Sequence, residues 1–252
     1  MQRPVISWAS AFLLLTAAVS GCASAPASPS RSTVPPSAAD GGASSRAWVP
    51  LGPLTEDQLW AARLGPADLP GGAVVEPAEP STPGSAANVA AASPECAPVL
   101  AAITEKPRAR WGAVYVVGNN TFGNRTEVDL GSFDPGQVRE RFDALTAAVR
   151  GGCPSLRTPA GSGYRTLKVR EVEFDGLEVP AICFGLDDPT GAITTTGGFS
   201  TVILYVALGD NRVLFMTGDD TAKTPAVRAD IVRAQLRKVT AQASSASPSA
   251  TG

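Results

Sequence analysis

The stretch STVILYVALGDNRVLFMT (residues 200–217) decides the fold of this chain. Two runs of mainly β-branched, aliphatic and aromatic residues, 200–208 and 212–217, flank the turn-forming residues Gly209, Asp210 and Asn211. Apolar runs on either side of a short glycine-containing turn are typical of an antiparallel β-hairpin. The stretch therefore predicts two adjacent antiparallel strands.

The segments around this hairpin extend the same pattern. Residues 165–174 and 178–186 predict two more strands, joined at the tight turn Asp175-Gly176, and residues 111–117 and 125–133 predict another pair. A short strand is expected at 73–75. Helices are expected to begin at Thr55, Pro94, the pair Asp134-Pro135 and the pair Thr224-Pro225, with Gly151-Gly152 ending the third. Hairpins dominate, so the sequence predicts a single α+β domain, an antiparallel β-sheet with helices packed against one face.

The N-terminal residues resemble a bacterial lipoprotein signal peptide. Arg3 precedes an apolar run at 5–19, and the small residues Ser20 and Gly21 lead into Cys22. The apolar run is shorter than the roughly 20 residues that a membrane-spanning helix needs. We therefore expect residues 1–21 to be removed, Cys22 to carry acyl chains such as palmitate, and the protein to be anchored by lipid at the extracytoplasmic face of the cell membrane.

Composition divides the remainder of the chain. Residues 22–49 consist largely of Ala, Ser, Pro, Gly and Thr, which predicts a disordered tether. Residues 50–243 are expected to form the domain, and residues 244–252 a disordered tail. The formal net charge of −2 and the absence of a basic patch argue against a nucleic-acid partner.

Three cysteines remain beyond the anchor. Cys96 and Cys153 both lie at the ends of expected elements, beside prolines and polar residues, whereas Cys183 lies in an apolar run. Disulfides are permitted outside the cytoplasm, so two of the three can pair. We expect a Cys96–Cys153 disulfide and a free, buried Cys183, although spacing alone leaves the other pairings open.

The sequence offers few catalytic candidates. It contains no histidine, which excludes Ser-His-Asp and Cys-His catalysis and histidine-containing zinc sites. We therefore expect no enzyme activity, metal or cofactor. The pairs Asp187-Asp188 and Asp219-Asp220 follow expected strands and could bind Ca²⁺ or act as an acid/base pair, but solvated turn residues are the simpler interpretation.

Aromatic residues are the candidates for ligand binding. Those that could line a groove are Trp111, Tyr115, Phe122, Tyr164 and Tyr205. Aromatics at strand spacing belong to a hydrophobic core more often than to a groove.

The order of elements resembles the PknH-like extracellular sensor domain family, here as a free-standing actinobacterial lipoprotein. The matching features span residues 54–243: Leu64 with residues 67–70 before a strand, Cys96 at the start of a helix, a helix ending at Cys153, paired strands including 201–208, and a last helix from Thr224. The resemblance implies a sheet flanked by helices, a groove for an unidentified ligand and no catalysis. That family carries two disulfides, and here Cys183 has no evident partner.

These observations favour a non-catalytic, membrane-anchored domain that binds a small ligand or an envelope component. The alternative is a protein-interaction module that docks onto an envelope transporter or receptor. An aromatic pocket would favour the first, and a flat, exposed apolar patch would favour the second.

Overall fold

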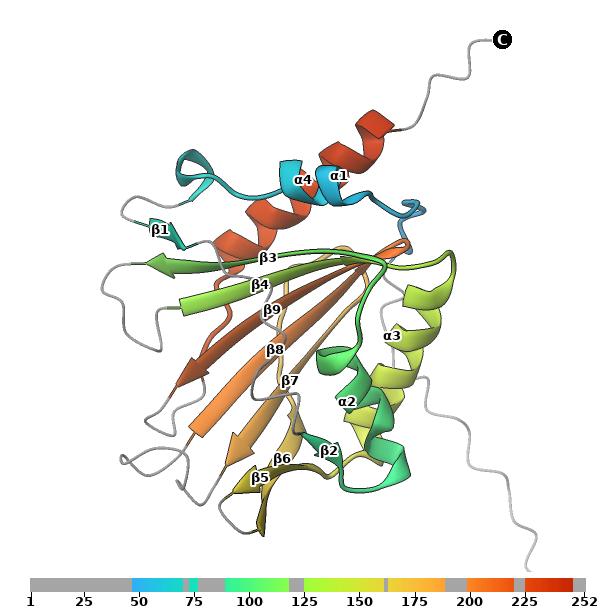
Figure 1. The fold of residues 1–252 in the computed structure, drawn as a ribbon, viewed down its shortest axis with the longest axis vertical. Helices are drawn as coiled ribbons and strands as arrows, with labels where there is room; N and C mark the ends of the chain where they lie inside the picture. The colour runs from blue at the N-terminus through green and yellow to red at the C-terminus, as the bar shows by residue number, and fades with distance from the viewer. Residues whose placement is uncertain are drawn as a thin grey trace, which may run out of the picture. The chain divides into compact units, whose positions relative to one another are not determined.

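The computed structural model describes residues 47–69, 73–76, 89–117, 125–160, 163–188, 199–219 and 225–246. Within these ranges the chain forms one antiparallel sheet in the order β1-β3-β4-β9-β8-β7-β6-β5-β2 (Figure 1). The strands are β1 (Ala73–Glu76), β2 (Ala90–Ala91), β3 (Ala109–Val117), β4 (Arg125–Ser132), β5 (Ser155–Ala160), β6 (Gly163–Glu171), β7 (Ala181–Asp188), β8 (Phe199–Leu208) and β9 (Asn211–Asp219). The expected antiparallel α+β fold is confirmed, and the hairpin of residues 200–217 becomes β8 and β9 near the middle of the sheet.

The helices form two groups, one on each face of this sheet (Figure 1). Helix α1 (Glu56–Ala61) contacts α4 (Ala229–Ala246), and α2 (Ala97–Thr104) contacts α3 (Gln137–Ala147). The short helical turns are η1 (Pro66–Asp68), η3 (Pro94–Cys96) and the π-helical turn η5 (Ala148–Gly152). The expectation that helices cover only one face is therefore wrong.

Strand β8 explains why both faces are covered. Val202 and Leu204 point into the cluster beneath α1 and α4, whereas Ile203 and Tyr205 point into the cluster beneath α2 and α3. Successive residues of a strand face opposite sides of a sheet, so a continuously apolar strand needs cover on both. The apolar run in the sequence carried this signal.

The β8–β9 turn also holds the N-terminal segment of the domain. Gly209 has a φ of 61°, and a Cβ at this position would lie 2.0 Å from the Leu51 carbonyl oxygen. The Asp210 backbone N–H donates to that oxygen at 2.8 Å, and the buried Asn211 side chain donates to the Gly52 carbonyl oxygen at 2.8 Å. Only glycine fits this close approach without displacing the segment.

The domain extends beyond the expected limits of 50–243. The Trp48 ring, in the segment expected to be a tether, packs edge-on against Phe142 of α3, with ring centroids 6.4 Å apart. At the other end, α4 continues to Ala246.

Helix starts differ in how well local signals predict them. Thr55 forms the expected cap of α1, because its hydroxyl accepts from the Gln58 backbone N–H while the Gln58 side chain accepts from the Thr55 N–H. Helix α3 begins at Gln137 rather than at Asp134, because Gly136 takes a left-handed φ of 83° and its N–H donates to Asp210 Oδ1 at 2.8 Å. Helix α4 begins at residue 229 instead of following directly on Thr224-Pro225.

Strands β2 and β5 and the β6–β7 connection also differ from expectation. Neither strand was predicted, because β2 has two residues and β5 contains Pro159, which is tolerated near a sheet edge. The β6–β7 connection covers residues 172–180 rather than a tight turn, with Gly176 at a φ of 80°.

Candidate functional site

The candidate site is a pocket between α2 and α3 that opens above β8 and β9. Its volume is about 390 Å³, within the range of small-molecule sites. Helix α2 contributes small apolar side chains, α3 contributes mostly polar ones, and the sheet contributes Tyr205 and Arg212. The lining residues are Ala97, Pro98, Ala101, Ala102, Glu105, Gln137, Glu140, Arg141, Ala144, Tyr205 and Arg212.

Tyr205 and Arg212 are deeply buried, with exposed fractions of 1% and 3%. Arg212 Nη1 donates to the Ala102 carbonyl oxygen at 3.2 Å, and Nη2 donates to Asp129 Oδ1 at 3.1 Å. Tyr205 Oη and Arg212 Nε are also buried, but neither has a hydrogen-bond partner within the described part of the chain. We call these two groups the open donors.

Open donors in a pocket wall need an explanation, because buried polar groups are nearly always hydrogen-bonded. Other buried polar atoms, such as Ser132 Oγ and Thr146 Oγ1, also lack a partner among the described residues, but they do not line this pocket. Tyr205 and Arg212 both line the cavity, but each open donor exposes less than 1 Å² of surface, so these two atoms lie behind the cavity wall.

The Tyr205 hydroxyl is neutral near pH 7, as that of an ordinary tyrosine is, and burial extends its neutral range. Burial raises the pKa of Tyr205 to about 12, while the positive charges of Arg212 and Arg141 act in the opposite direction.

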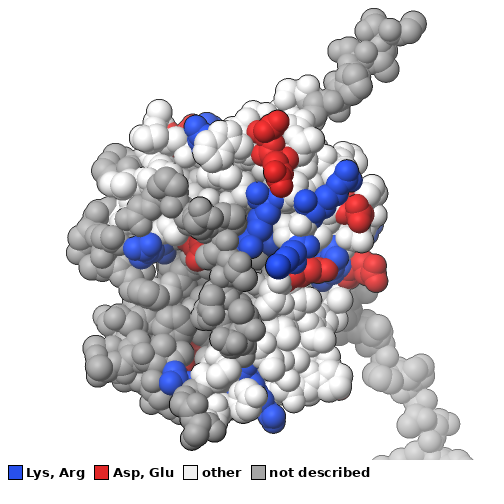
Figure 2. All heavy atoms as spheres, viewed as in Figure 1, with Lys and Arg blue, Asp and Glu red and all other residues white. Residues whose placement is uncertain are grey.

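The rim of the pocket carries charges of both signs. Arg141 forms an ion pair with Glu105, and its Nη1 donates to Gln137 Oε1 at 2.8 Å. The Arg141 guanidinium also lies 4.5 Å from the centroid of the Phe133 ring. Acidic and basic side chains lie next to one another on this face of the molecule (Figure 2). These contacts fix the rim while leaving the apolar wall of α2 exposed to the cavity.

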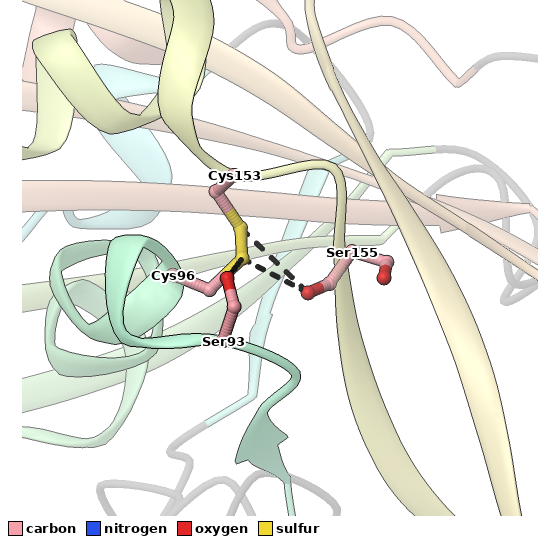
Figure 3. The surroundings of a disulfide bond; sticks show 4 residues. All are labelled: Ser93, Cys96, Cys153 and Ser155. Carbon is pink, nitrogen blue, oxygen red and sulfur yellow. Dashed lines mark hydrogen bonds between the residues drawn. A yellow bond between two sulfur atoms is a disulfide. The ribbon is translucent and has the colours of Figure 1, made fainter. Parts of the chain in front are cut away.

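The Cys96–Cys153 disulfide joins the ends of the two helices that form the pocket. Cys96 ends η3 directly before α2, and Cys153 follows η5 at the end of α3, with 4.6 Å between the two Cα atoms. The Ser155 carbonyl oxygen lies 3.0 Å from Cys96 Sγ (Figure 3). The expected pairing is confirmed, and it constrains both pocket walls.

Cys183 is free and buried, as expected. Burial raises the pKa of its thiol to about 12, so it behaves as a small apolar side chain.

The predicted aromatic residues do not meet in one groove. Tyr205 lines the α2–α3 pocket, whereas Trp111 and Tyr115 lie on the opposite face of the sheet. Tyr164 on β6 is 70% exposed, and Phe122 lies outside the described residues.

Tyr115 is a buried tyrosine whose hydroxyl is fully engaged. The Leu64 backbone N–H donates to Tyr115 Oη at 3.3 Å, and Oη donates to Gln235 Oε1 at 3.4 Å. Burial, the largest effect, raises the pKa of Tyr115 to about 12. Its place is structural: it connects β3 to α1 and α4.

The acidic pair at the end of β7 is held by structural contacts. Asp187 Oδ2 accepts from Arg170 Nε at 2.5 Å, and its Oδ1 accepts from the Ser200 hydroxyl at 2.5 Å. Asp188 is buried with Arg165 at 3.7 Å. The side chains of Asp219 and Asp220 lie outside the described residues. The arrangement of Asp187 and Asp188 is that of ion pairs between strands.

Within the described ranges, no three His, Cys, Asp or Glu side chains gather as metal ligands would. The helices in those ranges are also too short or too polar to cross a bilayer.

The sequence analysis missed Arg212, Arg141 and Glu105. Arg212 had a usable signal, since it is a charged residue directly after the turn of an otherwise apolar hairpin. Arg141 and Glu105 come from different helices and meet only through the packing of α2 on α3.

The comparisons with known proteins find solved structures of low similarity. No family model matches the chain, and no curated protein matches it. The extracellular domain of PknH from Mycobacterium tuberculosis is a similar solved structure, with 10% identity, a TM-score of 0.46, and coverage of 75% of this chain and 97% of that one. The Rv0999 ortholog from Mycobacterium smegmatis has 16% identity, a TM-score of 0.29, and coverage of 69% and 78%. The first structure is of the family that the sequence resembles, but both TM-scores are below 0.5 and both identities below 25%, so no argument about this chain is drawn from them.

Proposed function

We propose that this protein is a lipid-anchored extracytoplasmic binding protein whose α2–α3 pocket holds a small ligand, and that it acts by binding rather than by catalysis. The observation that carries the proposal is the pocket itself, a cavity of about 390 Å³ with small apolar side chains on its α2 wall and charged side chains at its rim.

The extracytoplasmic location is supported by two independent features. The N-terminal pattern ending in Cys22 predicts export and acylation. The Cys96–Cys153 disulfide is of a kind that persists in oxidising compartments and is rare in the cytoplasm. A domain on such an anchor would meet ligands from the cell envelope.

The location is tested by a Cys22→Ser variant of the full chain. The wild-type protein is expected in the membrane fraction with an intact mass that includes acyl chains on Cys22. The variant is expected to lose that mass and leave the membrane fraction. An unmodified wild-type protein would contradict the anchoring proposal.

Ligand binding is tested by native mass spectrometry of the full mature protein, extracted gently from its own membrane. We expect an additional non-covalent mass that Ala144→Trp removes, because Ala144 is exposed on α3 and lines the pocket. Ala147→Trp is the matched control, since Ala147 is also exposed on α3 but does not line the pocket. A bare wild-type chain, or equal loss in both variants, would count against this pocket.

The second candidate function, docking onto an envelope transporter or receptor, is favoured by the surface around Trp60. Trp60 is 56% exposed, packs edge-on against Trp111 at 6.3 Å, and carries the Arg63 guanidinium 4.0 Å above its ring. Exposed tryptophan and arginine are common anchors of protein interfaces. Loss of a co-purifying protein on Trp60→Ala, with the ligand mass retained, would favour docking.

A further inference from the structure

We propose that the surface around Trp60 docks onto anionic headgroups of the membrane that anchors the protein. This inference goes beyond the α2–α3 pocket, and it rests on the lipid anchor of the proposed function. It follows from an exposed tryptophan, from the charges beside it and from the length of chain between the domain and Cys22.

Trp60 borders a hollow between the end of α1 and the neighbouring helix α4 (Figure 1). The hollow has a volume of about 290 Å³, and we call it the Trp60 hollow. Trp60 is 56% exposed. Tryptophan favours the boundary between membrane and water, because its ring is apolar and its N–H is polar. The residues that line the hollow are Trp60, Ala61, Arg63, Gly65 and Lys238.

The charged side chains that line the Trp60 hollow are positive. The Arg63 guanidinium lies 4.0 Å from the centroid of the Trp60 ring and has no carboxylate partner among the described residues. Lys238 Nζ lies 2.7 Å from Asp68 Oδ2. The hydrogen bond from Lys238 is the largest cause that lowers the pKa of Asp68, and the charge of Arg237 acts in the same direction. Cations therefore outnumber the one carboxylate that they hold here.

The acidic residues of α1 lie away from the hollow. Glu56 and Asp57 are exposed in the first turn of the helix, whereas Trp60 and Arg63 belong to its other end. Exposed charges act over roughly 10 Å at 0.1 M salt. The attraction to anions is therefore local, and it is the end of α1 nearest Arg63 that is expected to face the headgroups.

An anionic lipid surface matches both features of the hollow. A free phosphate would engage the cations and leave the Trp60 ring in water. A bilayer offers anionic groups to Arg63 and Lys238, and the boundary beneath them accepts an aromatic ring. A protein partner could also use Trp60 and Arg63, but the proposed anchor keeps a bilayer beside the domain at all times.

The predicted tether makes weak docking sufficient. A flexible chain as long as the segment from Cys22 to Trp48 has its ends roughly 30 Å apart. A domain held at that distance meets the bilayer at a high effective concentration. A few charges and one aromatic ring are then enough, without the large apolar area that an untethered peripheral protein needs.

The test places the full mature lipoprotein in nanodiscs through its own anchor. The discs contain phosphatidylglycerol or phosphatidylcholine, with bromine on the acyl chains to quench a tryptophan that reaches the interface. We expect quenching to be at least roughly twofold stronger in the anionic discs. Trp60→Phe should remove this difference, while Trp48 and Trp111 report the background. About 1 M NaCl, which shortens the screening length to roughly 3 Å, should remove it as well.

Arg63 and Lys106 supply the matched charge variants. Both are exposed, but Arg63 lines the hollow, whereas Lys106 follows α2 on the other face of the sheet. Arg63→Gln is expected to lower the ratio of docked to undocked domain about fivefold, which corresponds to about 1 kcal/mol for one basic residue near an anionic surface. Arg63→Lys should restore most of the docking, and Lys106→Gln should leave it unchanged.

Three results would overturn the inference. The first is quenching that is equal in the two lipids or unaffected by Trp60→Phe. The second is equal loss in Arg63→Gln and Lys106→Gln, since general charge rather than this hollow would then hold the domain. The third is a co-purifying protein that Trp60→Phe removes without any quenching of Trp60 by lipid, which would favour a protein partner.

The lipid anchor and the docking surface can fail separately. The intact mass reports the acyl chains on Cys22, and the quenching reports Trp60. If the mass shows no acyl chains, the anchor fails. The same comparison on mature protein mixed with bromine-labelled vesicles then decides whether the Trp60 hollow binds anionic lipid without it.

Discussion

The two faces of the sheet each bury one tyrosine, and they treat its hydroxyl differently. Tyr115 lies beneath α1 and α4 with Leu64 and Gln235 as partners, whereas Tyr205 lies beneath α2 and α3 with no partner in the described ranges. Both side chains are at most 1% exposed, and burial raises the pKa of each to about 12. The difference is therefore one of hydrogen bonding, not of depth.

On the α1–α4 face the protein itself supplies hydrogen-bond partners to the buried tyrosine. On the α2–α3 face the described residues supply none. Under α1 and α4, the Gln235 side chain accepts from Tyr115 and donates to the Ala62 carbonyl oxygen at 2.8 Å. Under α2 and α3, Tyr205 borders a cavity. Unsatisfied buried groups reduce stability, so removal of the tyrosine hydroxyl is expected to affect stability differently on the two faces.

The largest expected effect comes from removing the Cys96–Cys153 disulfide on the α2–α3 face. The double variant Cys96→Ser, Cys153→Ser opens a loop with a sequence separation of 57, which is expected to lower the free energy of unfolding by about 4 kcal/mol in the chain-entropy model. Hydrogen exchange should rise first in α2 and the end of α3. Chemical denaturation measures the loss.

The control for the disulfide is Cys183→Ala, which removes a free thiol from the other cluster. It should cost about 1 kcal/mol, as a small buried truncation does. Equal effects of the two changes, or faster exchange beginning in α1 and α4, would break the contrast between the faces.

A second prediction concerns Gln235, whose side chain connects Tyr115 to the Ala62 carbonyl oxygen on the α1–α4 face. Gln235→Leu leaves both Tyr115 Oη and the Ala62 carbonyl oxygen short of a partner, so the free energy of unfolding should fall by about 2–3 kcal/mol. Gln242→Leu on the same helix, half-buried and without a side-chain bond among those described, should change it by less than about 0.5 kcal/mol. Equal urea midpoints for the two variants would show that the link contributes nothing.

How far the sequence predicts this fold is visible in β8 and β5. Strand β8 has a long apolar run beside a glycine turn, and both local signals agree with its place in the sheet. Strand β5 has Pro159 and little hydrophobic character, so its pairing with β6 depends on tertiary structure that no local pattern encodes. Covering both faces was predictable from β8, where consecutive residues are apolar.

The candidate site was less predictable than the fold. Tyr205 was singled out as an aromatic residue, but the property that matters is its missing partner, which depends on how α2 and α3 are spaced. Arg141 and Glu105 are separated by 36 residues and meet only in the folded chain. Sequence patterns report periodicity and turn chemistry, and they do not report which buried hydroxyl is left unsatisfied.

A third prediction is that the same Tyr→Phe substitution changes the free energy of unfolding in opposite directions on the two faces. Tyr205→Phe removes an unsatisfied buried hydroxyl and should raise the free energy of unfolding of the unliganded protein by about 1 kcal/mol. Tyr115→Phe removes a satisfied one and should lower it by about the same amount. Denaturation of ligand-free protein measures both. Destabilisation by Tyr205→Phe would mean that its hydroxyl has a partner in solution.

The smallest expected difference between the faces is in alkaline unfolding. An unfolded tyrosine ionises near pH 10, whereas Tyr115 and Tyr205 hold their protons to about pH 12 in the folded state. The stability from each raised pKa is therefore present below pH 10 and lost as the pH rises through 12. Removing either hydroxyl should flatten that decline equally, by up to about 1.4 kcal/mol per pH unit, because burial causes both shifts.

The Cys183 thiol titrates in both variants, so its contribution cancels from the comparison. Flattening by Tyr115→Phe alone would mean that water reaches the Tyr205 hydroxyl, and the two faces would then differ in depth as well as in hydrogen bonding.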